Sequence, residues 1–111
     1  MVTFYRYINT SNQMNIQVNN QTNLSNKYIR FIKWKIYQLK EKFHQLIYAE
    51  IFLKEEGKKP TMYVASIRLG IPGHDIIIKK QSADIWNLLL QSSKDAHRYL
   101  ANHKSIRING R

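Results

Sequence analysis

The apolar residues of this chain change their spacing along the sequence, and each change marks a change of secondary structure. From Leu24 to Phe43 they recur at helical intervals and share one face, at Tyr28, Ile32, Ile36, Leu39 and Phe43. From Leu46 to Lys54, and again over 62–71, apolar and polar residues alternate, as in strands with one buried face. The pattern therefore predicts a long amphipathic helix followed by two strands.

The remaining segments complete the predicted order of elements. Ile16 and Val18 alternate with polar neighbours, which is enough for a short first strand. Pro72-Gly73 predicts a tight hairpin that leads into a last strand from Asp75 to Lys80. Turn residues at 56–60 separate the two middle strands. The order becomes strand, helix, three strands and a second helix.

Both helices begin at residues that favour helix starts. Ser25 is expected to cap the first helix, and Ser82 the second, with Asp84 in the first turn. The second helix is expected to end near His103. Its predicted buried stripe consists of Ile85, Leu89, Ala96 and Leu100, with Ser92 as a polar gap.

These elements predict an α+β fold, β-α-β-β-β-α, with a four-stranded mixed sheet and two helices packed on one face. We expect residues 1–13 to form a loosely ordered extension, 14–104 the domain, and 105–111 a short basic tail. The open face of the sheet is expected to carry Tyr48, Phe52, Ile76 and Ile78.

Composition restricts the classes of function. The 111 residues fit one domain, and 18 Lys and Arg against 7 acids give a net charge of +11, which favours polyanionic partners. No cysteine, paired-histidine motif, phosphate-binding loop or nucleophile elbow is present, so we expect no metal, no cofactor, no small-molecule substrate and no catalytic residue. No apolar run is long enough to span a membrane and the start does not resemble a secretory signal, so a cytoplasmic protein is expected.

The first predicted helix carries cations of one sign on its polar side. An ordinary solvated face usually mixes signs, and this one holds a single acid, Glu41, so a polyanion-binding surface is the favoured interpretation. The aromatic residues Phe31, Trp34 and Tyr37 lie among these cations and could stack on bases or contact protein. The candidate RNA-binding residues of this helix are Lys27, Arg30, Lys33, Lys35, Lys40 and Lys42.

The second helix and the last strand supply further cations. Asn87, Gln91, Lys94 and Arg98 form one outward row, and Lys104 follows near the end of the chain. Side-by-side helices would join Lys94 and Arg98 to the lysines of the first helix. Lys79 and Lys80 are candidate RNA contacts too, although protection of a sheet edge would also explain them.

Several stretches share residues and spacing with one known family. They are Met14-Asn15-Ile16, Leu24-Ser25 with Leu39-Lys40-Glu41-Lys42-Phe43, Ala49 to Lys54, Ala65 to Gly73, Asp84-Ile85-Trp86, and Arg98-Tyr99-Leu100 with His103-Lys104. In order and spacing these stretches resemble the ribosome hibernation promoting factors of the YfiA type. The likeness spans about Met14 to Lys104 and is to the short type, which lacks a separate carboxy-terminal domain.

The resemblance implies the fold derived above, which is also similar to double-stranded-RNA-binding domains. It implies a stress-response factor that silences translation by binding ribosomal RNA, with ribosomal proteins as further partners, between the head and body of the small subunit. There it would overlap the mRNA path and the tRNA positions. Lys35, Lys42 and Arg98 fall on basic positions of the family, whereas Asp95 and Gln38 replace basic residues.

Three other functions stay open at this point. The chain could be a general RNA-binding module that acts off the ribosome, or a protein-interaction module whose binding does not depend on salt. A small ribonuclease that uses His74 is the least favoured, because the sequence offers no acid–base pair that supports this activity.

Overall fold

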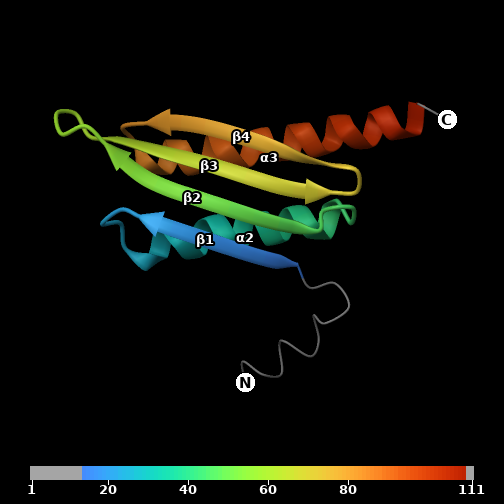
Figure 1. Cartoon of the computed structure of the whole chain (residues 1–111), viewed down its shortest axis with the longest axis horizontal. Coiled ribbons are helices and arrows are strands. Elements are labelled where there is room, and N and C mark those ends of the chain that lie inside the picture. Colours follow the sequence, from blue (N-terminus) through green and yellow to red (C-terminus); the bar gives the residue numbers. More distant parts are fainter. Residues whose placement is uncertain (1–13, 110–111) are drawn as a thin grey trace, which may run out of the picture.

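The computed structural model describes residues 14–109 of the chain, and side chains within residues 14–102. The predicted order of elements is confirmed (Figure 1). The elements are β1 (Asn15–Gln21), α2 (Asn26–Lys42), β2 (Tyr48–Glu56), β3 (Met62–Ile71), β4 (His74–Ser82) and α3 (Ile85–Asn109). Among the described residues, no helix combines the length and apolar character needed to cross a membrane.

The sheet is mixed, as predicted, with its strands in the order β1-β2-β3-β4. β1 runs parallel to β2, and the β2–β3 and β3–β4 pairs are antiparallel. Both helices lie on one face of the sheet, with α2 behind β1 and β2 and α3 behind β3 and β4 (Figure 1). Within residues 14–109 no helix or strand covers the opposite face, so this part of the chain forms two layers.

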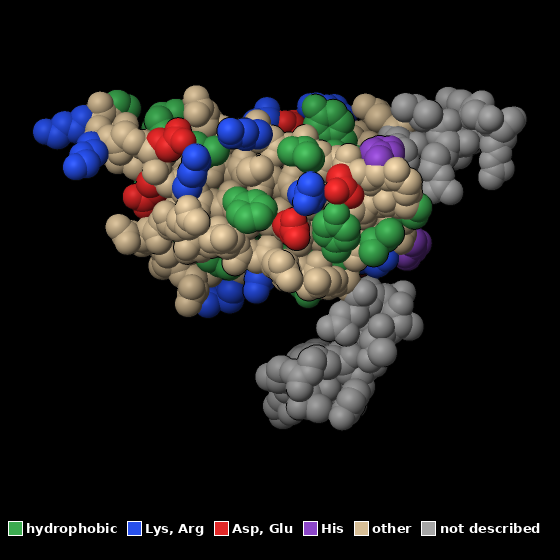
Figure 2. Space-filling view, viewed as in Figure 1, with side chains coloured by type: hydrophobic (Ala, Val, Ile, Leu, Met, Phe, Trp, Pro, Cys, Tyr) green, Lys and Arg blue, Asp and Glu red, His purple; other side chains and the backbone are tan. Residues whose placement is uncertain are grey.

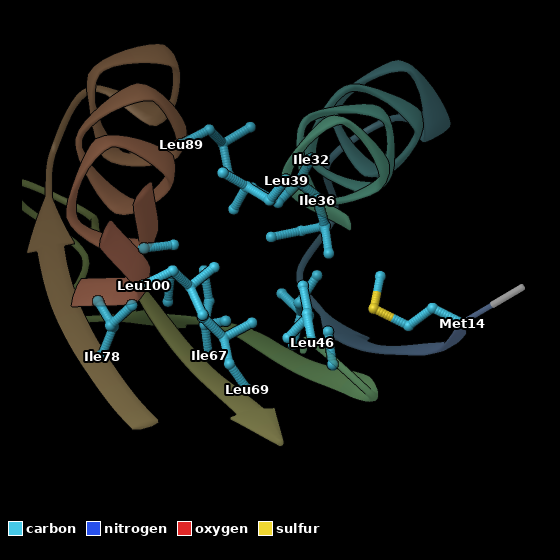
Figure 3. Packing of buried hydrophobic residues seen from close by; sticks show 14 of the residues in the cluster. Met14, Ile32, Ile36, Leu39, Leu46, Ile67, Leu69, Ile78, Leu89 and Leu100 are labelled. Carbon is cyan, nitrogen blue, oxygen red and sulfur yellow. The ribbon is translucent and has the colours of Figure 1, made fainter. Parts of the chain in front are cut away.

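The hydrophobic core lies between the sheet and the two helices (Figure 3). Ile32, Ile36 and Leu39 reach it from α2, at the spacing that the sequence predicts. Leu89, Ala96 and Leu100 reach it from α3, and Leu88, which the predicted stripe omitted, is buried beside them. Each of the large aliphatic side chains contributes roughly 1.5–3 kcal/mol by leaving water, so this layer holds the helices against the sheet.

The predicted register of the last strand is wrong by one residue. Ile78 is 3% exposed and pairs with Ile67 of the core, whereas Ile77 is 62% exposed and pairs with Arg68. Residues directly opposite each other project from the same face of a sheet, so the pairing places Ile77 on the open face and Ile76 and Ile78 toward the helices. The open face therefore carries Ile77 with Tyr48 and Phe52.

The predicted cap position of α2 is confirmed, whereas the predicted cap of α3 is wrong. Ser25 occupies the cap position of α2, but its side chain makes no capping hydrogen bond. Asp84, rather than Ser82, caps α3, because Asp84 Oδ1 accepts a hydrogen bond of 3.3 Å from the Asn87 amide. Ser82 Oγ in turn accepts a bond of 3.0 Å from the Asp84 amide. The serine thus orients the capping aspartate.

The second helix continues beyond the predicted end at His103, because α3 reaches Asn109. Helical backbone therefore occupies most of the segment that we expected to be a basic tail. The predicted extension, residues 1–13, lies outside the described residues. The division of the chain into extension, domain and tail stays a prediction.

Candidate nucleic-acid interface

The two helices meet along a seam that begins with aromatic rings. The Trp86 ring, in the first turn of α3, lies 4.7 Å from the Tyr28 ring and 5.2 Å from the Phe31 ring, centroid to centroid. Tyr28 and Phe31 belong to the first turns of α2, so both helices start at the same end of the domain and run side by side, as Figure 1 shows. This aromatic packing brings the two basic helices together.

Further along the same seam, the helices enclose a groove of about 250 Å³. Its lysines come from both helices, with Lys35 and Lys42 on α2 and Lys94 on α3. The other residues that line it are Gln38, Leu39, Ser93 and His97. We call this feature the lysine groove.

Within residues 14–102, none of the three groove lysines forms an ion pair with an acid. Three lysines that line one groove without counter-charges make it positively charged, so an anion that enters the groove is attracted. His97 is the fourth titratable group there, and its ring packs edge-on against Phe43 at 5.2 Å. The groove is thus suited to phosphate groups.

The fold is shared with two solved proteins. A ribosomal subunit interface protein from Coxiella burnetii has a TM-score of 0.72 at 16% identity, over 83% of this chain and 99% of that one. The N-terminal domain of Protein Y from Thermus thermophilus has a TM-score of 0.68 at 18% identity, over 81% of this chain and 99% of that one. This chain has the fold of the ribosomal subunit interface proteins. Neither a protein-family model nor a curated protein sequence matches it.

Two of the predicted RNA-binding cations have an acidic partner. Asp95 on α3 accepts from Lys80 Nζ at 2.8 Å and from Arg98 Nη2 at 3.0 Å. The Asp95 side chain is only 8% exposed, while those of Lys80 and Arg98 are 39% and 59% exposed. One carboxylate between two cations leaves a net positive charge, but it weakens the field that either cation offers to RNA.

Lys40 has a structural position. Its ammonium group donates to the carbonyl oxygens of His44, at 2.9 Å, and Leu46, at 2.8 Å. These bonds hold the loop between α2 and β2, where backbone carbonyls would otherwise lack partners. The sequence pattern predicted Lys40 to be an RNA contact. Periodicity alone does not show that the following loop brings backbone carbonyls within reach of the Lys40 side chain.

The other predicted contacts are divided between the two sides of the domain. Lys27 and Arg30 are exposed on α2 and Lys33 is half-buried, but none of them lines the lysine groove. Lys79 is exposed and pairs with Ser66, so it belongs to the open face, away from the helices. Lys104 belongs to α3, and its side chain lies outside the described ones.

The predicted aromatic residues also differ in their surroundings. Phe31 is half-buried between the helices, whereas Trp34 and Tyr37 are 55% and 45% exposed. The sequence reasoning gave no role to Trp86 or to Ser93. One sequence signal could have located the side of α3 that faces α2. It is a row of residues at helical spacing beside the buried stripe, namely Trp86, Leu90, Ser93 and His97.

The open face of the sheet has a different charge pattern. Arg68 lies 3.6 Å from a Glu50 carboxylate oxygen and 3.3 Å from an Asp75 one, and Lys54 pairs with Glu56 at 2.9 Å. Figure 2 shows acidic, basic and apolar side chains interspersed on this face. Because the signs balance there, attraction for a polyanion is concentrated on the helix side.

The open face also holds a perturbed tyrosine. The Tyr48 hydroxyl hydrogen-bonds the Asp75 side chain, and this bond raises the pKa of Tyr48 above its usual value of 10.0. Tyr48 is therefore a neutral donor at physiological pH. Among the described residues, no group of three or more histidine, cysteine or acidic side chains is arranged to hold a metal ion.

Proposed function

We propose that this chain binds the small ribosomal subunit through ribosomal RNA and blocks the channel that mRNA and tRNA occupy. In this proposal it is a non-enzymatic hibernation factor that acts in the cytoplasm during stress. The fold supports the proposal, since a solved relative in fold is described as a ribosomal subunit interface protein. The family likeness of the sequence stretches points the same way.

The observation that carries the proposal is the lysine groove between α2 and α3. Lys35, Lys42 and Lys94 converge there from two helices without an acidic partner among residues 14–102. Phosphate contacts fix the position of a protein on RNA, and they act without regard to sequence. Because the groove lies between the two helices, it contacts the RNA backbone only when the face of the domain that carries both helices is turned toward the RNA. The surface that binds the RNA is then also the surface that blocks the channel.

The test is co-sedimentation with purified small subunits over a series of salt concentrations. Contact with about six phosphates makes log K fall with log salt at a slope of roughly −0.7 to −0.9 per phosphate. Replacing Lys35, Lys42 and Lys94 together by Ala should weaken binding strongly and make the slope shallower by roughly two to three units.

The matched control removes three positive charges elsewhere. Lys54, Lys58 and Lys59 are exposed near the β2–β3 turn, and none of them lines the lysine groove. Their triple Ala variant has the same net charge as the groove variant, so it should keep most of the affinity and the slope. Equal losses in the two variants would mean that only net charge matters, and the proposed site would be rejected.

Two other functions predict different outcomes. A general RNA-binding module would be displaced from subunits by an equal concentration of duplex RNA, whereas a subunit-specific factor would not. A protein-interaction module is favoured by the open face, where Phe52 is 46% and Ile77 62% exposed. In that case binding would be insensitive to salt, and Phe52→Ala would weaken it more than the groove variant does.

A further inference from the structure

We propose that the aromatic end of the seam is a stacking site for an unpaired RNA base, next to the phosphates held in the lysine groove. The site consists of Phe31 and Trp34 on α2 and Trp86 on α3. This inference rests on the proposed function, because it specifies which kind of RNA the same surface accepts. It adds base recognition to what would otherwise be binding of the backbone alone.

The rings are packed against one another and still exposed. Phe31 lies at the centre, 5.2 Å from the Trp86 ring and 6.3 Å from the Trp34 ring. The Tyr28 ring also packs against Trp86, at 4.7 Å between centroids. Even so, Trp34 is 55% and Trp86 40% exposed. Rings held in place by neighbours lose little conformational freedom on binding, so stacking on them costs less than on a free side chain.

The cations around the rings select for a polyanion. Lys35 Nζ lies 5.7 Å from the Trp34 ring and 6.0 Å from the Phe31 ring, and Lys35 also lines the lysine groove. Lys27 Nζ lies 5.2 Å from the Tyr28 ring. The acid nearest in sequence to Trp86 is Asp84, whose carboxylate accepts the Asn87 amide at the helix cap. Lys35 thus joins the aromatic site to the groove.

The dimensions allow one short RNA to occupy both parts. Phe31 and Lys42 are eleven residues apart on α2, which at the rise of an α-helix is roughly 16 Å. Even in duplex DNA, consecutive phosphates of one strand advance by only about 3.4 Å along the axis, so a distance of this size spans a few nucleotides. A base on the rings and several phosphates in the groove can therefore belong to neighbouring nucleotides.

The base must be unpaired, since a base inside a duplex has both faces covered by its neighbours. RNA-binding proteins commonly stack splayed-out bases on aromatic side chains for this reason. An adenine offers a large π-face and no charge, so it is the probe of choice. The chemistry points to a bulged or terminal purine flanked by a helical stem.

The experiment compares two hairpin RNAs that differ at a single position. One carries an unpaired adenosine beside its stem, and the other an abasic ribose there, so their phosphates are identical. Wild-type protein should bind the adenosine hairpin about tenfold more tightly, as expected for one stacked base. The chain has two tryptophans, Trp34 and Trp86, so its tryptophan fluorescence reports on this site and should be quenched by the adenosine hairpin alone.

Trp34→Ala, at an exposed position, should abolish the preference between hairpins while leaving the affinity for the abasic hairpin unchanged. Phe52→Ala is the matched control, because this aromatic residue is similarly exposed but lies on the open face, and it should keep the preference.

If wild-type protein binds both hairpins with equal affinity, the stacking site is rejected. The proposed function is still supported in that case if binding to small subunits depends on salt and on the lysine groove. If Trp34→Ala weakens subunit binding although the two hairpins bind alike, the rings contact protein rather than a base, and the inference is rejected. Failure to bind both hairpins and subunits would reject the proposed function as well.

Discussion

Lys80 of β4 and Asp95 of α3 form an ion pair of 2.8 Å that ties the edge strand to the helix packed behind it. Arg98 reaches the other oxygen of the same carboxylate at 3.0 Å. The carboxylate is 8% exposed and both cations are more open to solvent. It therefore has a structural role in joining strand and helix, and an electrostatic one in reducing the positive charge beside the lysine groove.

Asp95→Asn should separate these two roles. Loss of a fully buried ion pair costs roughly 3–5 kcal/mol and loss of an exposed one about 0–1 kcal/mol. Since the Asp95 partners are partly exposed, we expect about 1–2 kcal/mol lower unfolding free energy in urea titrations. RNA affinity at low salt should rise a few-fold, because Arg98 is freed. Weaker RNA binding by the folded variant would mean that Asp95 positions Arg98 for the RNA.

Lys40→Ala should lower stability and leave RNA binding nearly unchanged. Its ammonium group holds the His44 and Leu46 carbonyl oxygens, and hydrogen bonds of charged groups contribute roughly 1.5–3 kcal/mol. We expect a loss of that size in chemical denaturation. Lys42→Ala, two residues away in the groove, is the control and should show the reverse pattern. Equal RNA-binding losses at the two positions would contradict the structural role of Lys40.

Gly70→Ala should destabilise the sheet. A Cβ atom at Gly70 would overlap the ring of Tyr48, which is its cross-strand partner. Forced repacking of this kind typically costs about 1–3 kcal/mol. The midpoint of urea unfolding measures the loss. When Gly70→Ala is combined with Tyr48→Ala, the extra cost of the glycine substitution should largely vanish, and strict additivity of the two changes would show that the overlap is not the cause.

Alkaline pH should weaken the contribution of Tyr48 to stability. Its hydrogen bond to the Asp75 side chain raises the pKa of Tyr48 in the folded chain above the unfolded value of 10.0. A raised folded pKa means that the stabilisation is complete below pH 10 and is lost as the pH rises from there through the folded pKa. The stability difference between wild type and Tyr48→Phe, measured by urea unfolding from about pH 8 upward, should therefore shrink above pH 10. A constant difference would argue against the bond.

Ser92→Ala should raise stability. The Ser92 hydroxyl is fully buried and has no hydrogen-bond partner within the described part of the chain. Burial of an unpaired hydroxyl costs roughly 1–3 kcal/mol, so its removal should add about 1 kcal/mol, seen as a higher midpoint of thermal unfolding. Ser93→Ala is the control, because Ser93 Oγ donates to the Leu90 carbonyl at 2.9 Å and should gain nothing.

The sequence alone determined the order of elements, the core face of every element except β4, and the two-layer fold. These features depend on local spacing: Ile32, Ile36 and Leu39 recur at helical intervals, and Ile67 and Leu69 at strand intervals, whatever the partner. The sequence also identified Lys35, Lys42 and Lys94 as candidate contacts, because residues that recur at helical spacing on one polar face can be recognised from spacing alone. It failed for Ile77 and Ile78, since a hairpin register depends on how the turn closes.

Only the tertiary structure decided how these cations differ from one another. Lys80 and Asp95 are fifteen positions apart, and their ion pair exists because α3 packs behind β4. The lysine groove likewise exists because Trp86 packs against Tyr28 and Phe31 and sets the two helices side by side. Electrostatic energy depends on distance in space, whereas periodicity reports only on distance along the chain. The spacing of residues in the sequence therefore could not predict which charges pair or that the two helices pack side by side.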